Sequence, residues 1–250
     1  SEQIASMCLT NGFYQPSASM SEHSLANRHI VVTGGLGVLG RAVGAVLVEQ
    51  GARVVLLDRV AAQDVPGITA VIGGIDLTDP DATRSAFQQA SERLQGFDGL
   101  VNAAGGFRWE TLESGTLESW DALYAMNLRS TVVACREALP RLLAADGSGI
   151  VNVGALAAQK AGMGMGAYAA SKAGVARLTE ALAEEVKDRG VRVNAVCPSI
   201  LDTPANRADM PDADTARWVS PRSLAAVIAF LLSDDASAVT GACIPVAGRV

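Results

Sequence analysis

The amino-acid sequence predicts an α/β protein built on a doubly wound, mainly parallel sheet of seven strands with helices on both faces. Seven short apolar runs are hydrophobic throughout rather than alternating with polar residues, which is typical of strands buried on both faces. Amphipathic stretches of helical period separate most of these runs, as in a parallel sheet with crossover helices. No Pro- or Ser-rich linker divides residues 28–250, so we expect one domain there.

The composition narrows the class of protein and its partners. Of the 250 residues, 49% are hydrophobic, which is enough for one large core. The formal net charge of −6 argues against nucleic acid or an anionic membrane as the main partner. No apolar run reaches the roughly 18 residues that a transmembrane helix needs. We therefore expect a protein that binds neither nucleic acid nor membrane.

The four cysteines are scattered, and neither a CxxC pair nor a Cys/His cluster occurs, so the sequence predicts no metal site. Scattered cysteines also favour a reducing, cytoplasmic location, and the N-terminus shows no basic-then-apolar signal peptide. Residues 1–27 are polar without clear periodicity, and we expect them to form a flexible arm.

The first half of the domain begins with a strand and a helix. Residues 29–33 are rich in β-branched side chains, and residues 39–50 follow with helical spacing that stops at Gly51. Asp79 is a favourable N-cap, and Pro80 a favourable first residue, for the next helix. The elements expected here are strands at 29–33, 52–58, 70–77 and 98–105 and helices at 39–50 and 79–94.

The second half of the domain contains two long helical stretches. One of them carries an apolar stripe at Val175, Leu178, Leu182 and Val186, and Gly190 follows its end. The elements expected here are strands at 149–155, 191–198 and 242–248 and helices at 117–144, 167–188 and 221–234.

The glycine-rich segment TGGLGVLG lies between the first strand and the first helix. Glycines let a backbone turn sharply and approach a pyrophosphate, and the following helix N-terminus offers free N–H groups. A tight turn without a ligand is the alternative, because Gly-rich turns are common. The residues expected to bind a dinucleotide here are Gly34, Gly35, Gly37, Leu39 and Gly40.

An acidic side chain, Asp58, ends the second strand. A carboxylate in this position can accept hydrogen bonds from the ribose 2′-hydroxyl and repels a 2′-phosphate, so it favours NAD(H) over NADP(H). Arg59 follows and softens that preference, so NADP(H) is not excluded. The alternative for Asp58 is a solvated turn residue.

Further candidates close the third and fourth strands, where open α/β sheets bind their ligands. An acidic and an apolar residue end the third strand near the expected adenine, and small residues after the fourth strand leave room for the ribose. Each position alone is compatible with plain packing. The candidates are Asp76, Leu77, Asn102, Ala103, Ala104 and Gly105.

Tyr168 and Lys172 lie four residues apart, so they share one face of a helix. A free tyrosine titrates at about 10, and a nearby ammonium stabilises the phenolate and lowers that pKa. Such a pair can act as a general acid in reduction or a general base in oxidation. The alternative is a half-buried tyrosine beside a solvated lysine.

Taken in order, TGGLGVLG, Asp58, NAAG, Asn127 in AMNL, YAASK, and VRVNAVCP with Thr203 beyond it resemble the short-chain dehydrogenase/reductase family over about residues 28–250. The resemblance implies a Rossmann-type fold, a nicotinamide cofactor, hydride transfer without a metal and a small-molecule substrate. It also implies a homodimer or homotetramer, formed through the helices expected at 117–144 and 167–188.

The resemblance assigns roles to particular residues. Tyr168 is the implied acid/base, and Lys172 tunes it and contacts the nicotinamide ribose. Asn127 is implied to bind a water of a proton relay and to maintain the helix geometry that the relay needs. Pro198 and Thr203 are implied to lie at the cofactor.

Two positions depart from the family pattern. Val38 replaces the middle glycine of T-G-x-x-x-G-x-G, so the pyrophosphate turn is expected to differ slightly. Ala155 stands thirteen residues before Tyr168, where the family generally carries a serine that donates to the substrate carbonyl. Losing one such donor typically costs about 10²–10³ in rate. Either the substrate is easily reduced or another group takes the place of the serine.

One branch of the family fits the missing serine. GALAAQKAGMGMGAYAASK and LDTPANRADMPDADTARW are similar to the corresponding stretches of quinonoid dihydropteridine reductase. That resemblance implies alanine at this position, a preference for NADH and an activated quinonoid imine as substrate. Another carbonyl or imine is an alternative, and so is a nucleotide-binding regulator with little turnover.

The loop at 199–218 is long, polar and interrupted by proline, as mobile functional loops often are, and the family places its substrate lid here. Aromatic and sulfur-containing side chains are expected to surround a flat substrate, with ordinary packing as the alternative. The expected substrate residues are Phe107, Trp109, Ala155, Met163, Met165 and Trp218.

Overall fold

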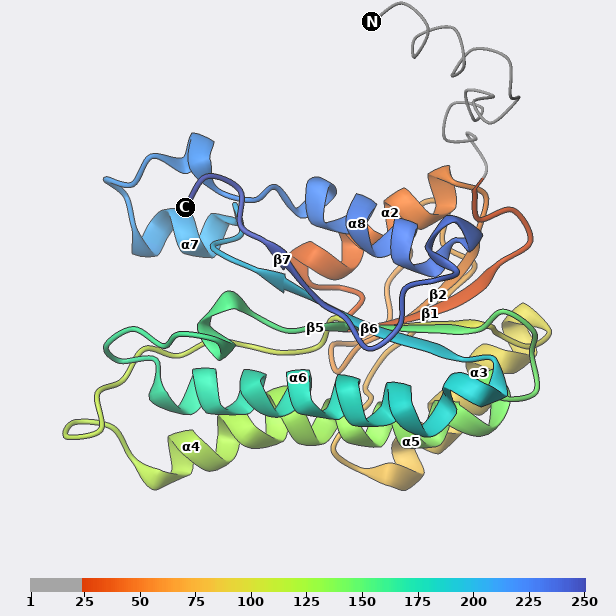
Figure 1. Ribbon diagram of the computed structural model, residues 1–250, viewed down its shortest axis with the longest axis horizontal. Helices are drawn as coiled ribbons and strands as arrows, with labels where there is room; N and C mark the ends of the chain where they lie inside the picture. The colour runs from red at the N-terminus through yellow and green to blue at the C-terminus, as the bar shows by residue number, and fades with distance from the viewer. Residues whose placement is uncertain (1–23) are drawn as a thin grey trace, which may run out of the picture.

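The fold is built on one sheet of seven parallel strands (Figure 1). The structure is a computed structural model and describes residues 24–250. The strands are β1 (His29–Thr33), β2 (Arg53–Leu57), β3 (Ala70–Ile72), β4 (Gly99–Asn102), β5 (Gly149–Val153), β6 (Arg192–Pro198) and β7 (Cys243–Val246). They follow the order β3-β2-β1-β4-β5-β6-β7, and every pair is parallel. The predicted fold class is confirmed, and the order changes direction between β1 and β4, which is where such sheets bind ligands.

Helices cover both faces of the sheet (Figure 1). One layer contains α2 and α8, and the other contains α3, α4, α5 and α6, while α7 follows β6. Their bounds are α2 (Val38–Glu49), α3 (Pro80–Leu94), α4 (Leu117–Leu123), α5 (Ser130–Leu142), α6 (Gly166–Val186), α7 (Pro204–Asp209) and α8 (Pro221–Leu232). Short 3₁₀ turns occupy Leu156–Ala158, Lys187–Arg189, Thr215–Arg217 and Asp234–Ala236. No helix among residues 24–250 combines the length and the apolar character that crossing a membrane requires.

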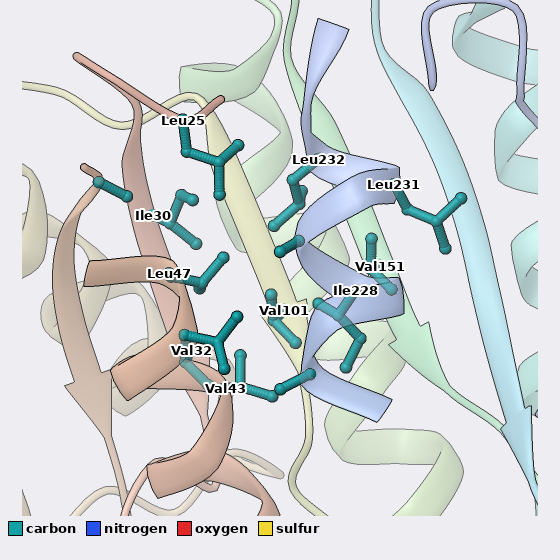
Figure 2. Close-up of a cluster of buried hydrophobic side chains, with 14 of the residues drawn as sticks. Leu25, Ile30, Val32, Val43, Leu47, Val101, Val151, Ile228, Leu231 and Leu232 are labelled. Carbon is teal, nitrogen blue, oxygen red and sulfur yellow. The ribbon is translucent and has the colours of Figure 1, made fainter. Parts of the chain in front are cut away.

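The core consists of two hydrophobic clusters, one on each face of the sheet. Successive strand residues point to opposite faces, so Val32 enters the cluster under α2 and α8 while Val31 enters the other. Figure 2 shows Leu47 of α2 and Ile228 of α8 in the first cluster above the sheet. Burying such side chains contributes roughly 1.5–3 kcal/mol each, which is why the strands must be apolar throughout.

The domain begins before residue 28. Residues 24–27 form a turn, and Leu25 is fully buried beside Ile30 in the first cluster (Figure 2). The backbone N–H of Leu25 donates to the carbonyl of Gln50 at 3.1 Å. These four residues therefore belong to the domain rather than to the predicted arm, whose residues 1–23 lie outside the described part of the chain.

Two elements differ most from their predicted bounds, while the remaining strands and helices differ mainly at their ends. The third strand ends at Ile72 rather than at residue 77, because Gly73 passes close to the backbone of Ala62 and Gly74 adopts a φ of +74°. The helix predicted over 117–144 is divided by a π-helical segment, η1 (Tyr124–Arg129), which separates α4 from α5. Single π-helical turns inside α-helices occur frequently at functional sites.

Candidate active site

Two adjoining cavities open at the carboxyl ends of the strands. The smaller, of about 710 Å³, surrounds Asp58, and the larger, of about 1210 Å³, surrounds Tyr168. They share wall residues from the turn after β1 and the segment after β4, so together they form one elongated site over the point where the strand order reverses. The shared residues are Gly34, Gly37, Ala103 and Gly105.

The glycine-rich turn needs its glycines for close packing. Gly34 has a φ of +64°, and a Cβ there would lie 2.7 Å from the Cα of Ala104. A Cβ on Gly40 would collide with the carbonyl oxygen of Gly34, so the turn and α2 can approach only without side chains. Gly35, which the sequence predicts to bind the cofactor, packs against Leu56 of β2 and lies off both cavity walls.

The N-terminus of α2 presents an uncompensated positive end to the site. Its first turn contains no acidic residue, and its N-cap, Gly37, offers no side chain. Within residues 24–250, no group accepts a hydrogen bond from the backbone N–H of Val38 or Leu39. Val38 and Leu39 also line the larger cavity. Free N–H groups and the helix dipole together make this end attractive to a phosphate.

Asp58 is fixed at the wall of the smaller cavity. One carboxylate oxygen accepts from the backbone N–H of Leu36 at 2.8 Å, and the other accepts from that of Val60 at 3.0 Å. Arg59 is exposed and lines the same cavity. The carboxylate keeps free lone pairs, so it can still accept a hydrogen bond from a ribose hydroxyl.

Asp76 and Leu77, which the sequence predicts to lie near an adenine, line the smaller cavity. The Asp76 carboxylate accepts from the hydroxyl of Thr78 at 2.7 Å and from its backbone N–H at 2.9 Å. These hydrogen bonds stabilise the ionised form and lower the pKa of Asp76. This part of the cavity therefore combines an apolar surface with a fixed negative charge.

The segment after β4 contributes its small residues but not its asparagine. Ala103, Ala104 and Gly105 line the cavities, whereas the side chain of Asn102 is buried within the sheet. The hydroxyl of Thr203 accepts from the backbone N–H of Asn206 at 3.2 Å and caps α7, off both walls. Neither Asn102 nor Thr203, both predicted to lie at the cofactor, forms part of the walls of these two cavities. Pro198 does line the larger cavity.

Tyr168 and Lys172 stand one turn apart on α6 and both line the larger cavity. The ring of Phe107 meets that of Tyr168 edge to face, with centroids 5.0 Å apart and an interplanar angle of 88°. The Lys172 amine is buried and donates to the carbonyl of Val153 at 2.7 Å. The two side chains therefore lie on one face of α6, as the sequence predicts, and the Lys172 amine contacts the end of β5.

Burial changes the acidity of both groups. Because the phenolate would lose its water, burial raises the pKa of Tyr168 to about 12, and the nearby Cys197 adds to that shift. Burial also lowers the pKa of Lys172 to about 8. The direction for Tyr168 is opposite to the sequence prediction, because the desolvation of the buried phenol is the dominant cause.

Asn127 is fully buried in η1 and links two parts of the site. Its side-chain oxygen accepts from the backbone N–H of Gly106 at 2.8 Å, and its amide donates to the hydroxyl of Ser171 at 3.0 Å. The Ser171 hydroxyl in turn donates to the carbonyl of Tyr168 at 2.7 Å. Asn127 therefore positions the segment after β4 against α6, while its side chain lies off the cavity walls.

The predicted substrate residues divide into two groups. Ala155, Phe107, Trp109 and Met165 line the larger cavity. Met163 is 79% exposed, Trp218 is only 9% exposed, and neither forms part of the wall of the larger cavity, so their substrate contacts stay predictions. Asn206, Asp209 and Met210 on the same wall lie within the predicted lid segment 199–218. Wall residues that the sequence analysis did not single out follow β4 and β5, whose carboxyl-end position was the available signal; they include Arg108, Leu156, Gln159 and Lys160.

Residues 24–250 contain no group of three or more His, Cys, Asp or Glu side chains arranged to hold a metal ion. A parallel sheet with a glycine turn, an acidic residue after β2 and a Tyr–Lys pair beside the shared cavity defines a dinucleotide-binding oxidoreductase.

Comparisons with known proteins identify the family. Residues 28–214 match the family described as short chain dehydrogenase. The chain is 32% identical over 246 residues to 2-(S)-hydroxypropyl-CoM dehydrogenase 3 of Xanthobacter autotrophicus, covering 90% of this chain and 96% of that protein. It is 33% identical over 237 residues to meso-2,3-butanediol dehydrogenase of Serratia marcescens, covering 89% and 94%. The chain therefore belongs to the short-chain dehydrogenase/reductase family and is an NAD(P)-dependent oxidoreductase.

A solved structure agrees with this assignment. A short-chain dehydrogenase of Burkholderia cenocepacia in complex with NADP superposes with a TM-score of 0.80 at 31% identity. The match covers 90% of this chain and 98% of that one. The seven-stranded fold thus coincides with that of a dinucleotide-binding relative over almost its full length.

The glycine at position 37 provides a direct test of the cofactor site. A Cβ there would meet only the carbonyl oxygen of Gly34, at 3.3 Å, and would otherwise project into the shared cavity. We expect Gly37→Ala to weaken NADH binding by tenfold or more, about 1.4 kcal/mol, while the melting temperature stays unchanged. Fluorescence titration and thermal denaturation measure the two effects.

The matched control is Gly162→Ala. Its added Cβ would also have a nearest contact of 3.3 Å, with the sulfur of Met165, but Gly162 lies off both cavity walls. NADH affinity should not change in this variant. Unaltered NADH binding in Gly37→Ala would remove the glycine turn from the cofactor site.

Proposed function

We propose that the protein transfers a hydride between NAD(H) and a small carbonyl, imine or alcohol substrate, with Tyr168 as the proton donor or acceptor. The observation that carries the proposal is the position of Tyr168 and Lys172 on the larger cavity, beside the wall that it shares with the cofactor cavity. The free N–H groups of α2, the open surface at Gly37 and the carboxylate of Asp58 fit a dinucleotide. The bound nicotinamide supplies the gain or loss of the hydride.

The proton step is assigned to the buried pair on α6. With a pKa of about 12, Tyr168 is a neutral phenol at pH 7 and can donate its proton to a substrate oxygen or nitrogen during reduction. With a pKa of about 8, Lys172 is mostly an ammonium at pH 7 and stabilises the phenolate that remains. Above pH 8 the ammonium is progressively lost, so the phenolate is less stabilised and Tyr168 becomes a weaker proton donor.

The preference for NAD(H) is assigned to Asp58. Its carboxylate lies on the wall of the smaller cavity, where a ribose 2′-phosphate would meet a negative charge. Arg59 on the same wall reduces the discrimination without abolishing it, because it is exposed and free to turn outward. The proposed cofactor is therefore NAD(H), with NADP(H) accepted less well.

A dihydropteridine-reductase-like activity on a quinonoid substrate is the second candidate, and Ala155 favours it. Ala155 lines the larger cavity, but its side chain has no hydrogen-bond donor. A quinonoid imine is already activated and needs less polarisation than a ketone. Phe107 and Trp109 on the same wall suit a flat ring. The relatives named above favour the first candidate, because their names indicate dehydrogenation of alcohols.

A nucleotide-binding regulator with little turnover is the remaining alternative, from another class of protein. The missing hydroxyl at Ala155 is the feature that favours it. The retained Asn127, Tyr168 and Lys172 favour the enzyme instead. The side chains of Asn127 and Lys172 are held by hydrogen bonds with the backbone of Gly106 and Val153.

A homodimer or homotetramer is proposed as well, together with a cytoplasmic location. Large apolar side chains lie exposed along α4, η1 and α5, and a second copy of the chain would cover them. Cys135, Cys197 and Cys243 are free thiols, which suits a reducing compartment. The exposed residues are Leu117, Trp120, Tyr124 and Val132.

Replacing the phenol tests the catalytic assignment. We expect Tyr168→Phe to lower kcat by about 10²–10⁴, because the general acid is lost, and to leave the Kd for NADH within about twofold. The assay follows NADH oxidation with quinonoid dihydropterin, diketones and aldehydes. Tyr124→Phe, in η1 and off both cavity walls, makes the same chemical change away from the site and should retain full activity. Near-normal turnover of Tyr168→Phe would exclude this residue from the proton step.

The cofactor preference has its own test. We expect Asp58→Ser to reduce the ratio of kcat/KM with NADH to kcat/KM with NADPH by about tenfold or more, since the repulsion of the 2′-phosphate disappears. The ratio is informative even if losing the hydrogen bonds to Leu36 and Val60 lowers both rates. Asp64→Ser, on the exposed loop after β2, should leave the ratio unchanged. An unaltered ratio in Asp58→Ser would contradict the ribose assignment.

Restoring the serine discriminates between the two substrate classes. We expect Ala155→Ser to raise kcat/KM for simple ketones and aldehydes by about tenfold, because a donor is added beside Tyr168, and to change that for quinonoid dihydropterin by less than about twofold. Ala158→Ser, in the same segment but off the cavity wall, is the control. Equal gains for both classes would contradict the idea that activation of the substrate replaces the serine.

A further inference from the structure

A chain of buried polar side chains crosses the sheet beneath the active site. The hydroxyl of Thr33 donates to the side-chain oxygen of Asn102 at 3.3 Å, and the Asn102 amide donates to the side-chain oxygen of Asn152 at 2.9 Å. The Asn152 amide then donates to the hydroxyl of Thr179 at 2.9 Å. All four residues are at most 2% exposed, so each unpaired polar atom would cost free energy.

This row of hydrogen-bonded side chains connects the strands that carry the site to the helix that carries the catalytic pair. Thr33, Asn102 and Asn152 are register partners at the carboxyl ends of β1, β4 and β5. Thr179 lies on α6, and its hydroxyl also donates to the carbonyl of Val175 at 2.8 Å. The hydrogen bond between Asn152 and Thr179 therefore joins the polar side chains of the sheet to the helix layer.

This hydrogen bond lies next to the contact made by Lys172. Val153 follows Asn152 in β5, and its carbonyl accepts from the Lys172 amine. Thr179 follows Lys172 by seven residues, about two helical turns, so both side chains lie on the same side of α6. Two neighbouring hydrogen bonds thus join β5 to α6, one through Lys172 and one through Thr179.

We propose that Asn152 and Thr179 form a positioning pair that fixes α6 against β5 and so holds Lys172 on the carbonyl of Val153. This inference rests on the proposed role of Tyr168 and Lys172. Neither Asn152 nor Thr179 lines the cavities, so the pair acts through Lys172 rather than on the substrate. Without the pair, α6 can shift on the sheet, and a small displacement of the amine changes its burial and its proton affinity.

The surroundings of Lys172 make its protonation a sensitive reporter. The titratable groups that face it are Tyr168 on α6 and Cys197 on β6, while Asn127 of η1 contributes an uncharged amide. Burial is the largest cause that lowers the pKa of Lys172. Any loosening of α6 that admits water must therefore raise this pKa toward the ordinary lysine value.

Thr179→Val tests the pair, because it removes the hydroxyl while retaining the shape of the side chain. Acetylation of Lys172 by acetic anhydride, followed by mass spectrometry across a pH series, reports the protonation of the amine without any need for turnover. We expect the midpoint of the pH dependence of Lys172 acetylation to lie at about pH 8 in the unaltered protein. In Thr179→Val we expect this midpoint to lie about one pH unit higher. We also expect kcat to fall about tenfold or more.

Two variants serve as controls. Thr179→Ser keeps the hydroxyl and should show the same acetylation midpoint as the unaltered protein. Thr83→Val removes a hydroxyl that is equally buried, on α3, but that has no hydrogen-bond partner within the described part of the chain, so it should change neither the midpoint nor kcat. If Thr179→Val does not fold, Thr179→Ala removes the same hydroxyl and leaves space for a water to satisfy Asn152.

The outcomes separate this inference from the proposed function. A midpoint that shifts in Thr179→Val or Thr179→Ala but not in the controls supports the positioning pair. An unshifted midpoint, or an equal shift in Thr83→Val, overturns it. If the unaltered protein fails to oxidise NADH with any of the tested substrates, the proposed function fails. The labelling of Lys172 still decides whether Asn152 and Thr179 position the amine.

Discussion

A buried lysine amine imposes the main constraint on this structure. Lys172 is nearly inaccessible to water, so its nitrogen needs a partner inside the protein, and the carbonyl of Val153 supplies one at 2.7 Å. That bond requires α6 to lie directly on the end of β5. The same contact places Tyr168 one turn away on the cavity wall, so the architecture of the sheet and the acid–base chemistry share one junction.

The features that follow from local pattern could be predicted from the sequence. Uniformly apolar strands must be buried on both faces, and Val31 and Val32 indeed enter opposite clusters. The glycine turn and Asp58 could be placed because strand ends in a parallel sheet meet at one edge, whatever the details of packing. Tyr168 and Lys172 could be paired because helical geometry alone puts residues four apart on one face.

Features that depend on burial could not be predicted in the same way. A single leucine in a polar stretch has no period, so the burial of Leu25 gave no signal. Asn102 and Ala103 are neighbours, yet one points into the sheet network and the other lines the site. The pKa of Tyr168 rises because the phenol loses water, an effect that depends on side chains packed from other elements, such as Phe107.

The central claim is that the phenol of Tyr168 and the buried amine of Lys172 stand beside the nicotinamide of a bound cofactor. A crystal structure of the protein grown with NADH tests it most directly. The account predicts that the adenosine lies in the smaller cavity at Asp58, with the nicotinamide ring in the larger cavity between Gly105 and Tyr168. A dinucleotide bound elsewhere, or a phenol directed away from the nicotinamide ring, would contradict the account.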